Sequence, residues 1–348
     1  MVCVRCMTFQ HSSYIKDAMN GFVMQETTFP YVCVIVDDAS SDGEPEIIKQ
    51  YLFDHFDMES SESSKEETED YVKYVSWHKT NKNCCFVVLL LKYNHYGKKD
   101  KGVYFKEWFD TAKYVAQCEG DDYWIDPKKL QKQVSIMEEN SKVMLVHSAF
   151  RMVNAKKEII EASRYRGYMN HSKSGDVFAR LLWRNYILTL TTCYRRELWA
   201  SETFKNAPKS LDYRMFLTAA ALGDIVYLEE ETGSYRMTDT GAVGTRQPMI
   251  HAAFWELVPY FSILYLRKET KKVYGFHWLL LNMIIQEESL KHFGLFKACI
   301  IRKPYLIWLY PISIVHKIYD YLCLRFKSNY DEFSTIEWIE GLGNWKNR

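Results

Sequence analysis

The chain has 348 residues, with 45 lysines and arginines against 44 aspartates and glutamates and a formal net charge of +1. This balance argues against a surface built to bind nucleic acid or another polyanion. The length suffices for one large domain, or for one domain with an appendage. Aromatic residues make up 16% of the chain, which indicates a large core together with surfaces that stack on ligands or face lipid.

The cysteines and the chain start indicate a reducing compartment. An odd number of cysteines in mostly apolar segments favours buried free thiols over a disulfide framework. The N-terminal residues lack the apolar stretch of a secretory signal, and no uncharged apolar window of about 18 residues predicts a membrane-spanning helix. We therefore expect a cytoplasmic protein. The nine cysteines are Cys3, Cys6, Cys33, Cys84, Cys85, Cys118, Cys193, Cys299 and Cys323.

The first 150 residues alternate between strand and helix patterns. The run at 31–36 is almost purely apolar and β-branched, as in a strand covered on both faces. Short connections between alternating elements are typical of an α/β domain with a largely parallel sheet. The predicted elements are a strand at 2–9, a helix at 13–25, a strand at 31–36, a helix at 44–53, a strand at 85–91, a helix at 103–113, a strand at 114–118, a helix at 127–140 and a strand at 143–150.

Two regions depart from this alternation. Residues 59–70, ESSESSKEETED, contain six acids, four serines and one lysine, a composition that predicts a solvated, mobile loop. We treat about 55–80 as an acidic insertion. From 151 to about 240 the expected elements become shorter and mixed, and after 250 the pattern becomes helical and rich in aromatics.

Polar clusters follow three of the predicted strands. They are FQH at 9–11, the pair Asp37 and Asp38, and CEGDDYWIDP at 118–127. In an open α/β sheet, ligands gather at the carboxyl ends of the strands. Unpaired carboxylates are costly to bury close together, so the third cluster is either a solvated turn or a place where something positive binds. Its last two residues, Asp126 and Pro127, also suit the start of a helix.

These stretches resemble the GT-A-fold glycosyltransferases of family 2, of the kind found in bacterial surface-polysaccharide gene clusters. The match spans roughly residues 2–240 in the family's order, and implies a GT-A domain at 1–245 with a nucleotide-sugar-binding, Rossmann-like mixed sheet. The remaining 246–348 would form a helical C-terminal region. The matching segments are VCVRCMTFQHSSYI from residue 2, VIVDDASSDG from 34, CEGDDYWIDPKKLQKQ from 118, LDYRMFL from 211 and SYRM from 234.

The resemblance implies a donor site for a nucleotide-sugar, most simply a UDP-sugar. Asp121 would bind Mg²⁺ or Mn²⁺, hard cations that suit carboxylate oxygens, and the metal would bridge the diphosphate. Glu119 stands where the family usually has Asp, and with Asp122 it would support the metal or contact the sugar or ribose. Asp38 would accept a hydrogen bond from the base. Phe9 would stack on the base, unless it is a core aromatic, and Met7 belongs to the same loop.

The second half resembles the acceptor side of the family. An inverting transfer needs a base that deprotonates the acceptor hydroxyl, and Asp212 matches the family's base. Asp212 also precedes an apolar helix, where an N-cap would lie. Arg236 resembles a cation that approaches the diphosphate, and the alternative is a surface residue or a structural salt bridge.

Aromatic and basic residues are interleaved beyond residue 250. They suit a bilayer surface, packing on the catalytic domain, or oligomerisation. By analogy with enzymes that act on lipid-linked acceptors, we expect a glycan or lipid-linked acceptor and peripheral contact through 250–330 with the inner face of the plasma membrane.

Two other functions remain open. A nucleotidyltransferase-like enzyme would need a glycine-rich phosphate loop after the first strand, and residues 8–14 contain no glycine. A non-catalytic protein that binds sugar-nucleotides would keep the sheet and bind the donor without turnover.

Overall fold

The computed structural model describes residues 1–161, 169, 172–183, 185–208, 212–238, 257, 260 and 261. The chain divides into two compact units. The first comprises Met1–Asp176, Tyr186–Lys205 and Thr218–Arg246, and the second Val177–Asn185, Asn206–Leu217 and Gln247–Arg348. The predicted helical region at 246–348 and the predicted membrane contact at 250–330 lie outside the described residues, apart from the isolated positions named above.

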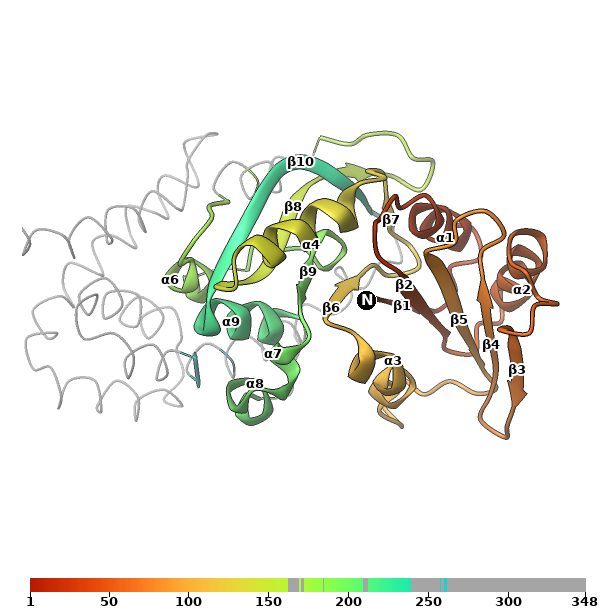
Figure 1. Ribbon diagram of the computed structural model, residues 1–348. Coiled ribbons are helices and arrows are strands. Elements are labelled where there is room, and N and C mark those ends of the chain that lie inside the picture. The colour runs from red at the N-terminus through yellow and green to blue at the C-terminus, as the bar shows by residue number, and fades with distance from the viewer. Residues whose placement is uncertain are drawn as a thin grey trace, which may run out of the picture. The chain divides into compact units, whose positions relative to one another are not determined.

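The first unit is built on one mixed sheet in the order β3-β4-β5-β2-β1-β6-β9-β8-β10-β7 (Figure 1). At its centre β1 pairs in parallel with β2 and β6, and β2 pairs in parallel with β5. The predicted α/β class is thus confirmed. The strands are β1 (Val2–Thr8), β2 (Tyr31–Asp37), β3 (Ser64–Glu67), β4 (Tyr71–Trp77), β5 (Cys84–Leu91), β6 (Tyr114–Gln117), β7 (Tyr123–Trp124), β8 (Val143–Val153), β9 (Cys193–Arg195) and β10 (Asp224–Arg236).

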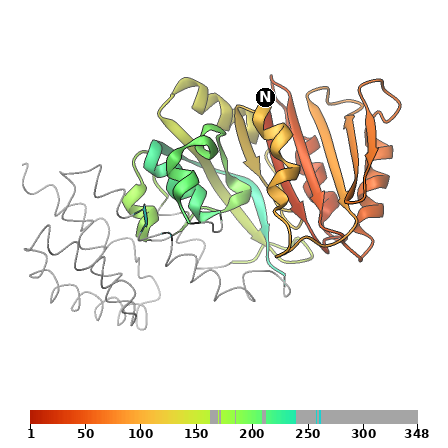
Figure 2. The same cartoon turned by 90° about the horizontal axis from the view of Figure 1, so that it is seen from below.

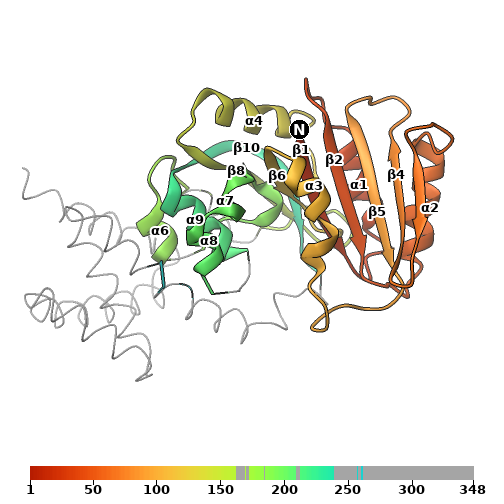
Figure 3. The same ribbon diagram turned by 60° about the horizontal axis from the view of Figure 1, so that its bottom comes forward.

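Helices cover both faces of the parallel strands, so these strands read as continuous apolar runs. One face packs against α1 (Ile15–Val23), α2 (Glu44–His55) and α4 (Lys129–Glu139). The other packs against η1 (Lys101–Tyr104) and α3 (Lys106–Thr111), which lie in front of the sheet in Figure 3. All seven residues of β2 are buried, as the run at 31–36 predicts. In place of the single helix predicted at 103–113, the chain forms the 3-10 helix η1 followed by the short α-helix α3.

The acidic insertion forms a hairpin, so the prediction of a loop over 59–70 is wrong at β3. Strand β3 pairs antiparallel with β4, which pairs antiparallel with β5, and these strands lie side by side in Figure 2. All four residues of β3 are exposed at the edge of the sheet. Their charges pair with neighbours, as in Lys92–Glu67 at 2.9 Å. Charged side chains suit an edge strand because they discourage further pairing, and the same composition imitates a loop in the sequence.

The remaining helices are short. They are η2 (Thr189–Thr191), α6 (Phe178–Trp183), α7 (Glu197–Ala200), α8 (Glu202–Asn206) and α9 (Tyr213–Leu222). Within the second unit the hydroxyl of Tyr213 donates to the carbonyl oxygen of Leu181, and the rings of Phe178 and Phe261 meet edge to face at 6.2 Å. Across the described residues, no helix is long and apolar enough to cross a bilayer.

Candidate functional site

The loops that follow β1 and β2 are joined by hydrogen bonds. The backbone N–H of Gln10 donates to Ser40 Oγ, and its side-chain amide donates to Ser41 Oγ, both at 2.9 Å. The backbone N–H of Ser12 donates to Asp42 Oδ2, also at 2.9 Å. The polar residues that follow both strands therefore form one structure at the carboxyl edge of the sheet.

A buried carboxylate, that of Glu44, organises these two loops. Glu44 is the first residue of α2 and is fully buried. It accepts hydrogen bonds from the Thr8 hydroxyl, from the His11 backbone N–H at 2.9 Å and from Ser40 Oγ at 2.9 Å. The start of a helix also favours a negative charge. The local sequence pattern predicts only a helix start here and gives no signal for this role.

The acidic loop after β6 is bound directly to the end of β1. The backbone N–H of Met7 donates to Glu119 Oε2 at 3.2 Å, and the N–H of Gly120 donates to the carbonyl oxygen of Met7 at 3.0 Å. A Cβ atom on Gly120 would lie 2.1 Å from Thr8 Oγ1, so only glycine fits. Met7 therefore contacts the acidic loop through its backbone, and its contact with the donor stays a prediction.

The two adjacent aspartates of the loop have different surroundings. Asp121 is half-buried, with Oδ2 3.8 Å from His11 Nε2. Asp122 is buried, and its Oδ1 accepts the backbone N–H of Arg236 at 2.8 Å. Burial, reinforced by the charge of Asp121, raises the pKa of Asp122 well above its usual range. Asp121 is therefore the more accessible of the two carboxylates, and Asp122 is the one that fixes the loop to β10.

The side chain of Arg236 also holds the acidic loop. Its Nε donates to the carbonyl oxygen of Asp121 and its terminal nitrogen pairs with Asp17 Oδ2, both at 2.8 Å. The guanidinium lies over the rings of Tyr14 and Tyr123, 4.5 and 5.2 Å from their centroids. The structural salt bridge that the sequence allowed for Arg236 is thus present, and the contact with a diphosphate stays a prediction.

Asp38, at the end of β2, is held by the loop after β5. It is 2% exposed. Its Oδ1 accepts the N–H of His95 at 2.7 Å, and its Oδ2 pairs with Lys101 Nζ at 2.6 Å. No local sequence pattern singles out Lys101. Beside it, burial raises the pKa of Asp37 to about 6, while one oxygen of Asp37 accepts the N–H of Ser40 at 3.2 Å.

Two further predicted residues have simple surroundings. Phe9 is 44% exposed after β1, so the alternative of a core aromatic is wrong and the ring is open to stacking. Asp212 is exposed directly before α9, and its carbonyl oxygen accepts the N–H of Met215 at 2.9 Å. Its role as a base stays a prediction.

The start of the next helix differs slightly from the prediction. Helix α4 begins at Lys129 rather than at Pro127. Asp126 still serves the helix start, because its Oδ1 accepts the N–H of Lys128 at 2.9 Å. Asp126 therefore belongs to the helix start rather than to the group around Asp121.

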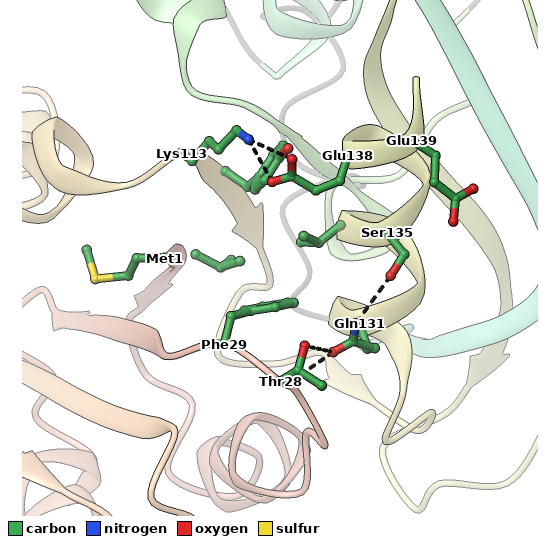
Figure 4. Close-up of a pocket in the computed structure, with 11 residues that line it drawn as sticks. Met1, Thr28, Phe29, Lys113, Gln131, Ser135, Glu138 and Glu139 are labelled. Atoms are coloured by element: carbon green, nitrogen blue, oxygen red, sulfur yellow. Dashed lines mark hydrogen bonds and ion pairs between the residues drawn. The ribbon is translucent and has the colours of Figure 1, made fainter. Parts of the chain in front are cut away.

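A hollow of about 280 Å³ lies elsewhere, at the opposite ends of the strands (Figure 4). It is bordered by the starts of β1 and β6 and by one side of α4, where Gln131 binds Thr28 and Lys113 binds Glu138. None of the predicted site residues lines it. The carboxyl edge of the sheet remains the candidate site.

The Asp121 carboxylate at this edge is the type of group that hard divalent cations prefer. In the described parts of the chain, no group of three or more His, Cys, Asp or Glu side chains is arranged to hold a metal alone. Asp121 and His11 face each other, however. Mg²⁺ is commonly held by one or two carboxylates together with substrate phosphates, a mode in which one carboxylate would suffice.

The strand order and the position of the acidic loop define the first unit as a GT-A type of fold. S. aureus TarS in complex with UDP-GlcNAc is similar over 99% of this chain and 91% of its own, with a TM-score of 0.52 and 14% sequence identity. The mannosyltransferase PcManGT from Pyrobaculum calidifontis, in complex with GDP-Man and Mn²⁺, covers 100% of this chain and 88% of its own with a TM-score of 0.46 and 12% identity. At 14% sequence identity, the likeness to TarS shows a shared fold and nothing further.

Curated relatives exist in mycobacteria. Uncharacterized proteins of Mycobacterium tuberculosis and Mycobacterium bovis are 27% identical over 238 residues, which is 66% of this chain. The match spans 57% of the length of these relatives. No protein-family model matches the chain.

Proposed function

We propose that the chain is a glycosyltransferase that moves a sugar from a nucleotide-sugar, UDP-linked, to a hydroxyl acceptor. The observation that carries the proposal is the meeting of three strand ends at one edge of the sheet. There the backbone N–H of Met7 in β1 donates to Glu119, which follows β6. Asp38, which directly follows β2, donates its backbone N–H to the carbonyl oxygen of Thr8 at the end of β1, 3.0 Å away. The GT-A type of fold supports the same function.

The nucleotide would lie across the loops after β1 and β2. Phe9 exposes its ring there, and base–aromatic stacking is a common source of affinity. The Asp38 carboxylate is an acceptor and complements a base that presents an N–H, as uracil does. Lys101 and the His95 N–H hold this carboxylate in place. The diphosphate would follow toward Asp121.

A divalent cation, Mg²⁺ or Mn²⁺, would be held at Asp121, where it would neutralise the charge that develops on the departing diphosphate. The chain itself fixes the position of that carboxylate. Gly120 packs against Thr8 with no room for a side chain, and Arg236 holds the carbonyl oxygen of Asp121. Glu119 accepts the backbone N–H of Met7 and would support the bound donor.

The finer parts of the proposal rest on the sequence resemblance. They are inversion with Asp212 as the base, membership of family 2, a role in cell-surface polysaccharide assembly, and a glycan or lipid-linked acceptor. A cytoplasmic location is supported by the seven described cysteines, which are all buried free thiols, as expected in a reducing compartment. We further propose contact with the inner face of the plasma membrane through 250–330.

Thermal unfolding with UDP, GDP, CDP and TDP, each with and without Mn²⁺, tests the donor class. We expect UDP with Mn²⁺ to raise Tm most, because the proposed donor is UDP-linked and its diphosphate would share the cation. A ligand at a hundred times its Kd stabilises the folded state by about 2.7 kcal/mol. Hydrolysis or transfer of a UDP-sugar then separates an enzyme from a protein that only binds the donor. If no nucleotide shifts Tm with or without metal, the proposal is wrong.

A further inference from the structure

The side chain of His11 faces the acidic loop across a gap. His11 Nε2 and Asp121 Oδ2 are 3.8 Å apart, and the two side chains are 24% and 27% exposed. This separation is too long for a hydrogen bond. Both groups keep access to a ligand at the carboxyl edge of the sheet, and neither is packed into the core.

The hydrogen-bond partners of the ring assign its tautomer. The Thr8 hydroxyl donates its single proton to Glu44 Oε1. Only lone pairs then remain on Thr8 Oγ1 for the contact with His11 Nδ1 at 3.2 Å. The proton of a neutral ring therefore lies on Nδ1, and Nε2 carries a lone pair. In that tautomer two lone-pair-bearing atoms, His11 Nε2 and Asp121 Oδ2, face each other across the gap.

We propose that His11 Nε2 is a second protein ligand, beside Asp121, for the divalent cation of the donor site. The inference rests on the proposed function and names a residue that the sequence resemblance leaves unassigned. Two metal–ligand bonds of about 2.1 Å place their ligand atoms between about 3.0 and 4.2 Å apart, for bond angles from a right angle to a straight line. The observed 3.8 Å lies within this interval.

The residues behind His11 match the support that metal-binding histidines usually have. Such a histidine donates its other ring N–H to a carboxylate, carbonyl or water, and this partner fixes the ring orientation. Here Thr8 is that partner, and Glu44 orients Thr8 while also accepting the backbone N–H of His11 at 2.9 Å. Thr8 and Glu44 are therefore positioning residues, which act on the cation only through His11.

Pulsed electron paramagnetic resonance of Mn²⁺ with UDP, bound to the full chain labelled with ¹⁵N-histidine, tests the ligand directly. We expect a coupling between Mn²⁺ and a directly bound ¹⁵N nucleus. It should disappear in His11→Gln and persist in His55→Gln, a matched control at the exposed end of α2. In calorimetry, Thr8→Val should weaken Mn²⁺ binding in the presence of UDP by about 10–100-fold, as is typical for loss of a ligand's supporting partner.

The labelled wild type decides the matter even if a variant fails to fold. If Mn²⁺-dependent UDP binding requires Asp121 but the wild type shows no ¹⁵N coupling, His11 is not a ligand and the proposed function stands. A coupling that persists in His11→Gln also rejects His11. If the wild type shows no Mn²⁺-dependent UDP binding at all, the metal-dependent donor site and this inference are both wrong.

Discussion

The backbone N–H of Met7 donates to Glu119 Oε2, 3.2 Å away, and thereby binds the end of β1 to the acidic loop after β6. The two residues are 112 positions apart in the sequence. Gly120 completes the junction through its own bond to the Met7 carbonyl oxygen, 3.0 Å long. The position of the Asp121 carboxylate therefore depends on close packing between two strand ends.

Gly120→Ala tests this packing. The added Cβ would lie 2.1 Å from Thr8 Oγ1 and 2.6 Å from Thr8 Cβ, so the loop must move. Overpacking of this kind typically costs about 1–3 kcal/mol. We expect a lower free energy of unfolding in urea and weaker Mn²⁺-dependent UDP binding. Gly102→Ala is the control, because its Cβ would meet only the side chain of Asp100, at 3.0 Å. Equal effects of the two substitutions would argue against the packing account.

The ion pair between Arg236 and Asp17 predicts a second difference. The Arg236 side chain is 1% exposed and that of Asp17 16%, and breaking a buried pair typically costs about 3–5 kcal/mol. Asp17→Asn should lower stability far more than Glu231→Gln, which breaks an exposed pair with Arg151 in which the side chains are 45% and 38% exposed. Exposed pairs contribute about 0–1 kcal/mol. Urea denaturation of both variants measures the difference, and similar losses would contradict a larger contribution from the buried pair.

Lys129 predicts a pH dependence of stability. It is fully buried, its Nζ donates to Gln133 Oε1 at 2.6 Å and it lies 4.5 Å from the ring centroid of Trp124. Burial lowers the pKa of Lys129 to about 8, below the value of about 10.4 in an unfolded chain. The unfolded state then binds more protons between these values, so the unfavourable contribution of Lys129 is complete below pH 8 and is relieved as the pH rises.

The measurement is the difference in free energy of unfolding between Lys129→Met and wild type, from urea denaturation between pH 7 and 10.5. We expect Lys129→Met to be the more stable at pH 7, and its advantage to shrink by about 3 kcal/mol, at 1.36 kcal/mol per unit of pKa shift. Comparison with the variant cancels the ionisation of the buried thiols over the same range. A difference that stays constant with pH would contradict a depressed pKa of Lys129.

Asp212→Asn tests the proposed base. If Asp212 deprotonates the acceptor, the amide should leave UDP binding unchanged and lower kcat by about 10²–10⁴-fold, the usual contribution of a general base. Calorimetry and steady-state kinetics with a UDP-sugar separate the two effects. Asp224→Asn, at the start of β10, is a matched control. Normal turnover of Asp212→Asn would remove Asp212 from the reaction.

The central strands and the acidic loop were predictable because their signals are local. The apolar run at 31–36 is β2, and the stretch from Glu119 to Asp122 follows β6 as expected. The motif around it also contains Lys129 and Gln133, which bind each other in the core. Part of what makes this motif recognisable is therefore packing rather than ligand binding.

The partners of the site residues were not predictable, because they come from distant segments. Arg236 and Asp17 are 219 positions apart, and Lys101 and Asp38 are 63 apart. No local pattern pairs such residues. At β3 the local composition predicts a loop, and this prediction is wrong because an exposed edge strand carries the same charged residues as a loop.

The most direct test of the proposed function is calorimetric titration of UDP into wild type and Asp121→Ala, each with Mn²⁺ and with EDTA. The account predicts that wild type binds UDP much more tightly with Mn²⁺ than with EDTA, and that Asp121→Ala loses this gain while its thermal unfolding shows a folded protein. Asp126→Ala is the matched control, because its carboxylate serves the start of α4, and it should keep the gain. Equal UDP affinity of wild type and Asp121→Ala in Mn²⁺ would contradict the central claim.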